Sequence, residues 1–166
     1  PRSVALGSYR AAISPGEYRS RPGFFSSAAR EFGVPAKLLR AVAQRESSMQ
    51  PFAVCLDGEA HYPDTAQEAL ELIRGHRNYD LGLMQINSYW IRSFGLDPAE
   101  VVRPEANVRL GALILSRCIQ RWGPTWQAVG AYHVGHPRND PQGLRRYAMR
   151  VLAAYHALRA DPVDDR

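Results

Sequence analysis

The stretch Pro35-Ala-Lys-Leu-Leu-Arg-Ala-Val-Ala-Gln-Arg-Glu-Ser-Ser48 combines the apolar stripe of a core helix with a carboxylate on the same stripe. Leu38, Val42 and Glu46 recur every four residues, and residues at this spacing share one face of a helix. Proline is well suited to the first helical position. The sequence therefore predicts a helix from Pro35 to about Ser48 whose apolar face continues to Glu46.

Most of the remaining chain also has helical patterning. Thr65 and Glu68 have the spacing of a capping box, and Asp97-Pro98 has the pattern of a helix start. Gly33 and Gly123 are suited to end helices. These signals and the apolar periodicity predict helices at 27–32, 65–75, 104–122, 125–132 and 142–158, with shorter helical segments after 87 and after 97.

One segment is expected to form β-structure. Asp57-Gly58 is a two-residue turn signal between the runs 52–56 and 59–62, which predicts a small β-hairpin. The first 22 residues mix Arg, Ser, Gly and Pro without hydrophobic periodicity. We therefore expect a mainly α fold, with a flexible N-terminal arm at 1–22, one helical domain with a β-hairpin insertion at 23–159, and a polar tail at 160–166.

The composition limits the kinds of partner. The chain has 166 residues, 45% of them hydrophobic, which suits one domain with a hydrophobic core. Its formal net charge of +5 comes almost entirely from arginine, since Lys37 is the only lysine. This charge fits either a polyanionic partner or an ordinary solvated surface. The sequence has no zinc finger, P-loop or RNA-binding signature and no apolar run of membrane-spanning length, so we expect no nucleic-acid partner and no integral membrane segment.

Cys55 and Cys118 are the only cysteines, and they allow two interpretations. A disulfide between them would close a long loop and be worth about 4 kcal/mol. Two free thiols in the core explain them equally well. Their spacing is not that of a zinc site, and we expect neither a metal nor a cofactor.

Glu46 is the strongest candidate for a catalytic residue. A carboxylate on an apolar helix face loses solvation when it ionises, which raises its pKa and keeps it protonated near neutral pH. Such a group can act as a general acid and then, once ionised, as a base. On periodicity alone, a glutamate that faces solvent or pairs with arginine explains this position more simply.

Four separated motifs favour the catalytic interpretation. They are Glu46-Ser47, the run Gly82-Leu-Met-Gln-Ile-Asn87, the run Ala131-Tyr-His-Val-Gly135, and Tyr147. In their order and spacing, over about residues 24–158, they resemble the motifs of the soluble lytic transglycosylases. The resemblance implies a lysozyme-like α+β fold and an enzyme that cleaves peptidoglycan.

The same resemblance implies a set of site residues. Glu46 is the implied catalytic acid and base, and Tyr147 is placed to hydrogen-bond it across the cleft. The family usually has asparagine where this chain has His133, and the charge of an imidazole depends on pH. The implied substrate-binding residues are Ser47, Met84, Gln85, Asn87, Tyr132, His133 and Tyr147.

The resemblance also implies a mechanism with a single carboxylate, although ordinary glycosidases use two. The N-acetyl oxygen of N-acetylmuramic acid (MurNAc) would attack its own anomeric carbon while Glu46 protonates the leaving N-acetylglucosamine (GlcNAc), and the product would be 1,6-anhydroMurNAc. Asp80, just before the second motif, keeps open a muramidase that hydrolyses the same bond with water. A non-catalytic wall-binding module is the third interpretation.

The insertion at 60–79 is similar to that of the small transglycosylases of type III and type IV secretion, conjugation and pilus systems. This similarity implies a role in local wall opening during assembly of such a machine. It also implies a periplasmic or exported location, with peptidoglycan glycan strands and components of an envelope-spanning machine as partners.

Overall fold

The computed structural model describes residues 23–158, and the expected arm at 1–22 and tail at 160–166 lie outside the described residues. The described part is mainly α with a small antiparallel sheet, as the sequence predicted. The helices are α2 (Gly23–Phe32), α3 (Ala36–Ser47), α4 (Ala66–Leu72), α5 (Ser88–Ser93), α6 (Pro98–Val101), α7 (Pro104–Trp122), α8 (Trp126–Val134) and α9 (Pro141–Ala157). The strands are β1 (Val54–Leu56), β2 (Glu59–His61), β3 (Asp80–Leu81) and β4 (Ile86–Asn87).

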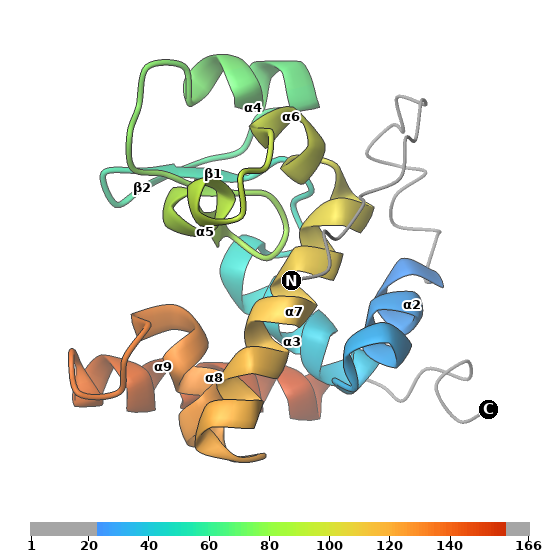
Figure 1. The fold of residues 1–166 in the computed structure, drawn as a ribbon, viewed down its shortest axis with the longest axis vertical. Helices are drawn as coiled ribbons and strands as arrows, with labels where there is room; N and C mark the ends of the chain where they lie inside the picture. Colours follow the sequence, from blue (N-terminus) through green and yellow to red (C-terminus); the bar gives the residue numbers. More distant parts are fainter. Residues whose placement is uncertain (1–22, 159–166) are drawn as a thin grey trace.

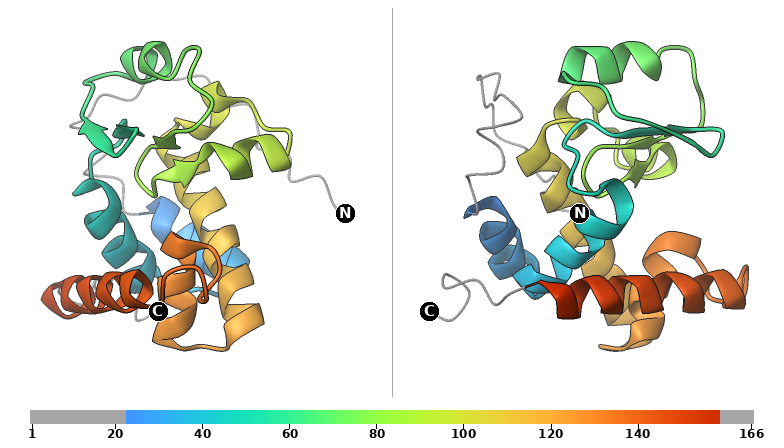
Figure 2. Two further views of the ribbon diagram at one scale, coloured as in Figure 1. Left: turned by 90° about the vertical axis from the view of Figure 1, so that its left-hand side faces the viewer. Right: turned by 180° about the vertical axis from the view of Figure 1, so that it is seen from behind.

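The elements divide into two groups joined by the long helix α7 (Figure 1). One group contains the sheet with α4, α5 and α6, and the other contains α2, α3, α8 and α9 (Figures 1 and 2). Helix α7 runs from the first group into the second, and α3 and α9 pack against each other in the second group. None of the described helices is long and apolar enough to span a membrane.

The sheet is larger than the predicted hairpin. Strands β1 and β2 form that hairpin, with Leu56 opposite Glu59 across a turn in which Asp57 and Gly58 both have positive φ. Strands β3 and β4 extend it, giving the antiparallel order β2-β1-β3-β4. The prediction missed these two strands because each is only two residues long, too short to produce an alternating pattern.

The helix boundaries follow the sequence signals closely. Helix α7 has the predicted bounds, with proline in its first turn and Gly123 as its C-cap. Thr65 caps α4 by accepting the backbone N–H of Glu68. Helix α2 begins at Gly23 instead of the predicted residue 27, because Phe25 in its first turn is buried in the core.

The core joins both groups of elements. Leu39 and Val42 of α3 are fully buried, as are Leu81 of β3 and Leu115 of α7. They belong to one continuous cluster of buried apolar side chains. Burying a side chain of this kind stabilises the fold by about 1.5–3 kcal/mol. The end of α3 is therefore anchored firmly, and the orientation of Glu46 depends on this anchoring.

Candidate active site

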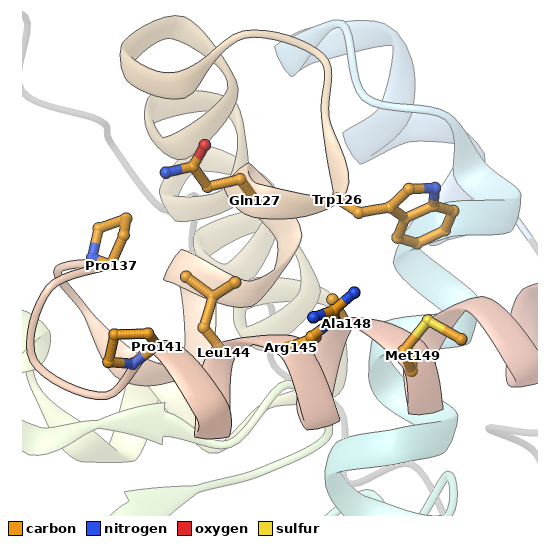
Figure 3. A pocket seen from close by; sticks show the side chains of 8 residues that line it. All are labelled: Trp126, Gln127, Pro137, Pro141, Leu144, Arg145, Ala148 and Met149. Carbon is orange, nitrogen blue, oxygen red and sulfur yellow. The ribbon is translucent and has the colours of Figure 1, made fainter.

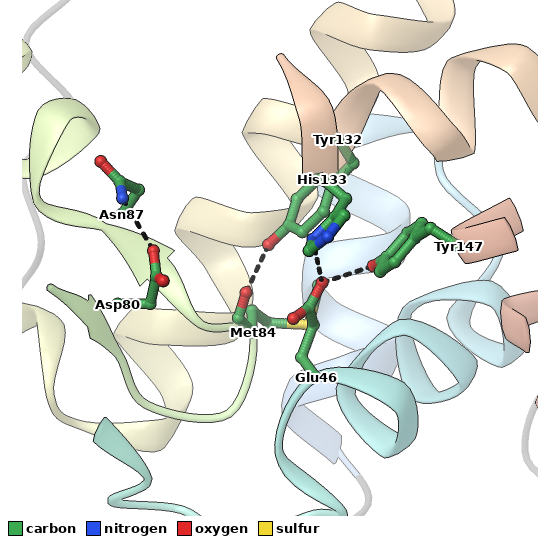
Figure 4. Close-up of polar contacts among 7 residues, drawn as sticks. All are labelled: Glu46, Asp80, Met84, Asn87, Tyr132, His133 and Tyr147. Atoms are coloured by element: carbon green, nitrogen blue, oxygen red, sulfur yellow. Dashed lines mark hydrogen bonds and ion pairs between the residues drawn. The ribbon is translucent and has the colours of Figure 1, made fainter. Parts of the chain in front are cut away.

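Glu46 lies in the last turn of α3, and the chain leaves the helix immediately after it. Ser48 and Met49 both have positive φ, an unusual conformation for residues other than glycine, and it turns the backbone sharply toward β1. The Glu46 side chain is only 12% exposed. In Figure 4 it points toward side chains from α8 and α9, so three helices enclose this carboxyl group.

The surroundings of Glu46 favour its neutral form. Burial raises the pKa of Glu46 from its ordinary value of 4.5 to about 7. A hydrogen bond from Tyr147 and the charge of Arg45 lower this pKa by less than burial raises it, and the charge of Asp80 raises it slightly further. Near neutral pH the carboxyl group therefore exchanges a proton readily, as a group that serves as acid and then as base must do.

Tyr147 is the direct partner of Glu46. Its hydroxyl donates a hydrogen bond of 2.6 Å to Glu46 Oε1, the contact that the sequence predicted, and the tyrosine is only 3% exposed. Its ring stacks on that of His133, with centroids 4.5 Å apart and planes 3° from parallel. The short hydrogen bond and the stacking fix both Tyr147 and the carboxyl group that it contacts.

Tyr147→Phe should shift the pH dependence of cleavage. The hydrogen bond lowers the pKa of Glu46, so its loss raises that pKa, and the alkaline limb of the pH profile moves to higher pH. The maximal rate should fall by roughly tenfold, the contribution of one hydrogen bond to a charged group. The control is Tyr155→Phe on the same helix. A Tyr147→Phe profile that coincides with that of the wild type would contradict this role.

His133 is the second polar neighbour of Glu46. Its Nδ1 lies 3.9 Å from Glu46 Oε1, beyond hydrogen-bond distance, and its side chain is about half exposed. Burial, followed by the charge of Arg45, lowers the pKa of His133, while the charges of Asp80 and Asp140 raise it by less. The imidazole therefore holds a proton less readily than a solvated histidine does.

His133→Asn should remove an acidic limb from the pH profile. Below the lowered pKa of His133, an imidazolium lies beside a sugar that develops positive charge in the transition state, and it opposes that charge. We expect wild-type cleavage to decline as the pH falls through the lowered pKa of His133, and the asparagine variant to retain its rate there. Initial rates on purified sacculi measure this. Parallel acid limbs in the two proteins would rule out this effect of His133.

The second motif forms a tight loop whose side chains bind its own backbone. Gln85 has a φ of 44°, and its Nε2 donates to the carbonyl oxygens of Ala53 and Gly82. Met84 is fully buried, and its carbonyl oxygen accepts a 2.7 Å hydrogen bond from the Tyr132 hydroxyl. The side-chain amide of Gln85 therefore stabilises the loop. The Met84 side chain, which was predicted to bind substrate, has no exposed surface with which to contact a sugar.

Two further predicted residues also have structural partners. Ser47 is 1% exposed, and its hydroxyl donates to the carbonyl oxygen of Ala43, one turn earlier in α3. Asn87 is exposed, and its side chain caps α5 at Tyr89 while its Nδ2 donates to Asp80. The Ser47 hydroxyl therefore bonds to the backbone of its own helix, whereas Asn87 orients the Asp80 carboxylate at the edge of the site.

Asp80 lies across the site from Glu46 (Figure 4). In the sheet it pairs with Cys55 on one side and with Asn87 on the other. Burial raises the pKa of Asp80, and the Asn87 hydrogen bond lowers it by less. A second carboxyl group therefore lies in the electrostatic field of Glu46, as the muramidase interpretation requires.

Asn107 is a residue that the sequence analysis missed. It is fully buried in α7, its Oδ1 accepts the backbone N–H of Met84, and its Nδ2 donates to the carbonyl oxygens of Leu81 and Val101. A Cβ atom at Gly82, where φ is +78°, would lie 2.4 Å from Asn107 Nδ2. One amide thus holds the second motif loop against the central helix. The sequence feature that could have revealed Asn107 is a polar residue among the apolar residues on the buried face of α7.

Two cavities border α8, the helix that carries Tyr132 and His133. One, of about 590 Å³, is bounded by α5, α7 and α8 and includes Tyr132 in its wall. The other, of about 420 Å³, lies between the start of α8 and the outer face of α9 and contains none of the predicted site residues (Figure 3). Between residues 23 and 158, no three His, Cys, Asp or Glu side chains are grouped as a metal site, and Cys55 and Cys118 are free thiols.

Comparison with known proteins identifies the family. The transglycosylase SLT domain matches residues 23–150. The chain is 31% identical to invasion protein IagB of Salmonella typhimurium over 139 residues, covering 81% of this chain and 76% of IagB. It is 29% identical to X polypeptide of Escherichia coli K12 over 142 residues, covering 82% of this chain and 74% of that protein. It is 26% identical to protein IpgF of Shigella sonnei over 148 residues, covering 87% and 86%.

The family match spans the sheet, the loop of the second motif, α3, α8 and the part of α9 that contains Tyr147. Its presence agrees with the lysozyme-like α+β architecture and with peptidoglycan as the substrate. The chain belongs to the transglycosylase SLT family and is a peptidoglycan lytic transglycosylase.

Proposed function

We propose that this enzyme cleaves the β-1,4 bond between MurNAc and GlcNAc and leaves a 1,6-anhydroMurNAc end, with Glu46 as the only catalytic acid and base. The observation that carries this proposal is the enclosed Glu46 carboxyl group, whose pKa is raised to about 7 beside the Tyr147 hydroxyl. A group with this pKa holds a proton for the leaving sugar and can take one back in the next step.

The proposed reaction has two steps. Glu46 gives its proton to the glycosidic oxygen of GlcNAc, the bond to the MurNAc anomeric carbon breaks, and the MurNAc acetamido oxygen bonds to that carbon. The Glu46 carboxylate then accepts the proton of the MurNAc C6 hydroxyl, whose oxygen displaces the acetamido oxygen from the anomeric carbon. Glu46 therefore ends the reaction protonated, as it began, and no water is consumed.

Asp80 supports one alternative reaction. Its charge raises the pKa of Glu46, so the two carboxyl groups influence each other across the site. A muramidase would use Asp80 as the second carboxylate and release a reducing MurNAc end. Burial raises the pKa of Asp80, so its carboxylate is more basic than that of a solvated aspartate.

Mass spectrometry of the products separates these reactions. Purified sacculi are digested with the wild type and with Asp80→Asn, and the released muropeptides are analysed without chemical reduction. The proposal requires anhydro ends from both proteins. Reducing ends that disappear in Asp80→Asn would establish hydrolysis and overturn the proposal.

We further propose that the enzyme acts in the periplasm or after export, opening the wall locally for a secretion, conjugation or pilus machine. The similarity to proteins named invasion protein IagB and IpgF supports this role. The test is complementation of a Salmonella typhimurium strain that lacks IagB, with the Glu46→Gln variant as the control. Equal complementation by both proteins, or by neither, would argue against the role.

A further inference from the structure

The cavity between α5, α7 and α8 has the properties of a binding site. Its volume of about 590 Å³ lies within the range of small-molecule sites, roughly 300–1,000 Å³. It shares Tyr132 with the candidate active site, and Ala131 and Gly135 of the same motif also line it. Tyr132 therefore lies in the wall of this cavity, while its hydroxyl contacts the second motif loop at Met84 (Figure 4).

Aromatic side chains supply much of its wall. Tyr89, the residue after the first of α5, is 60% exposed, and Trp122 closes the end of α7. The Trp122 ring packs edge to face with His136, with centroids 5.3 Å apart. Such aromatic groups present an apolar face beside a polar edge, which suits a ligand with both apolar and hydroxyl surfaces, such as a sugar ring.

Two arginines give the cavity a positive charge. Arg117 lies over the Phe94 ring at 4.9 Å, and Arg121 lies over the Trp122 ring at 5.1 Å. These contacts use the flat faces of the guanidinium groups and leave their N–H edges available. No carboxylate lines the cavity, and within the described part of the chain neither arginine takes part in an ion pair.

A guanidinium edge binds a carboxylate through two parallel hydrogen bonds, so an arginine pair beside a sugar-sized cavity selects a sugar that carries an acid group. In the polymer that this enzyme cleaves, MurNAc carries such groups on its lactyl substituent and stem peptide. We propose that Arg117 and Arg121 form a subsite for the carboxylate-bearing substituent of a muramyl residue. This inference rests on the proposed function, because it takes the glycan strand as the ligand.

Binding of non-cleavable ligands tests this subsite separately from catalysis. The disaccharide GlcNAc-MurNAc with a tetrapeptide, the same disaccharide with a free lactyl group, and tri-N-acetylchitotriose all lack a MurNAc-GlcNAc bond. Titration calorimetry would compare the wild type with Arg117→Gln/Arg121→Gln. The control is Arg30→Gln/Arg74→Gln, which removes the same charge from two exposed residues. Neither residue lines the cavity of about 590 Å³ or the cavity of about 420 Å³.

The double variant should bind at least one carboxylate ligand about tenfold or more weakly, while its affinity for neutral chitotriose and the affinities of the control remain unchanged. Loss with the tetrapeptide ligand alone identifies the stem peptide, and loss with both acidic ligands identifies the lactyl group. No loss, equal loss for all three ligands, or no binding of acidic ligands to the wild type would overturn the proposal. None of these binding results depends on cleavage. A failure of the proposed reaction would instead be recognised from the products that the enzyme releases.

Discussion

Glu46→Gln is expected to reduce the cleavage of purified sacculi by at least about a thousandfold. Glutamine keeps the size of the side chain and can accept the Tyr147 hydrogen bond, but it has no proton to give and cannot serve as a base. General acid and base catalysis each contribute about 10²–10⁴ in rate, and both functions depend here on one residue. Release of soluble muropeptides measures the loss.

The fold of this variant should be retained and should be more stable than the wild type in alkaline solution. Because the folded-state pKa of Glu46 is raised, the native protein loses stability as pH increases from about 4.5 through about 7. Glutamine removes this loss, so the variant should gain ~1–3 kcal/mol at pH 8 and little at pH 4. Glu59→Gln, at an exposed position, is the control. Substantial activity in Glu46→Gln would refute the mechanism.

Asn107→Ala is expected to cost about 3–5 kcal/mol of folding free energy, the largest stability effect that we predict for a single polar side chain. The substitution leaves the N–H of Met84 and the carbonyl oxygens of Leu81 and Val101 without their partner in the interior. Each buried polar group left in this way costs roughly 1–3 kcal/mol. Denaturant unfolding followed by circular dichroism measures the difference.

The same variant should lose activity before it unfolds, because Asn107 holds the loop that includes Met84, and the Met84 carbonyl oxygen orients Tyr132. Asn78→Ala, at an exposed position, provides the matched control and should change stability by less than about 0.5 kcal/mol. A loss below about 1 kcal/mol in Asn107→Ala would mean that the loop does not depend on this amide.

Local signals in the sequence predicted the helices well. Pro104 and Gly123 specify the two ends of α7 without reference to the rest of the fold, and the Thr65 cap does the same for the start of α4. The hairpin was predictable from Asp57-Gly58 for the same reason, because both residues adopt the positive φ that such a turn needs. Each of these features depends on a few neighbouring residues.

The features that required the structure depend on contacts between distant elements. Strands β3 and β4 exist through pairing with β1 and with each other. The stacking of His133 on Tyr147 depends on how α8 packs against α9, which no local pattern encodes. The function of Asn107 was hidden for the same reason, since its side chain binds backbone groups of Met84 and Leu81 that only the folded chain brings beside α7.

The family resemblance identified the catalytic residue, and the structure explained its protonation. The motifs selected Glu46, but only the structure supplies the burial that raises its pKa and the Tyr147 hydroxyl that partly offsets this effect. His133 illustrates the reverse case. It departs from the usual residue of the motif, and its position beside Glu46 explains how that departure should affect the pH profile.

The protonation of Glu46 decides directly whether this residue can be the proton donor. The side-chain carboxyl carbon of Glu46 can be followed by ¹³C NMR across pH 3–10, with the Glu46→Gln variant used to assign its signal. The burial of this carboxyl group predicts a midpoint at about 7. A midpoint near the ordinary glutamate value of 4.5 would show a carboxylate that is already ionised at neutral pH, and it would contradict the role of this residue as the proton donor.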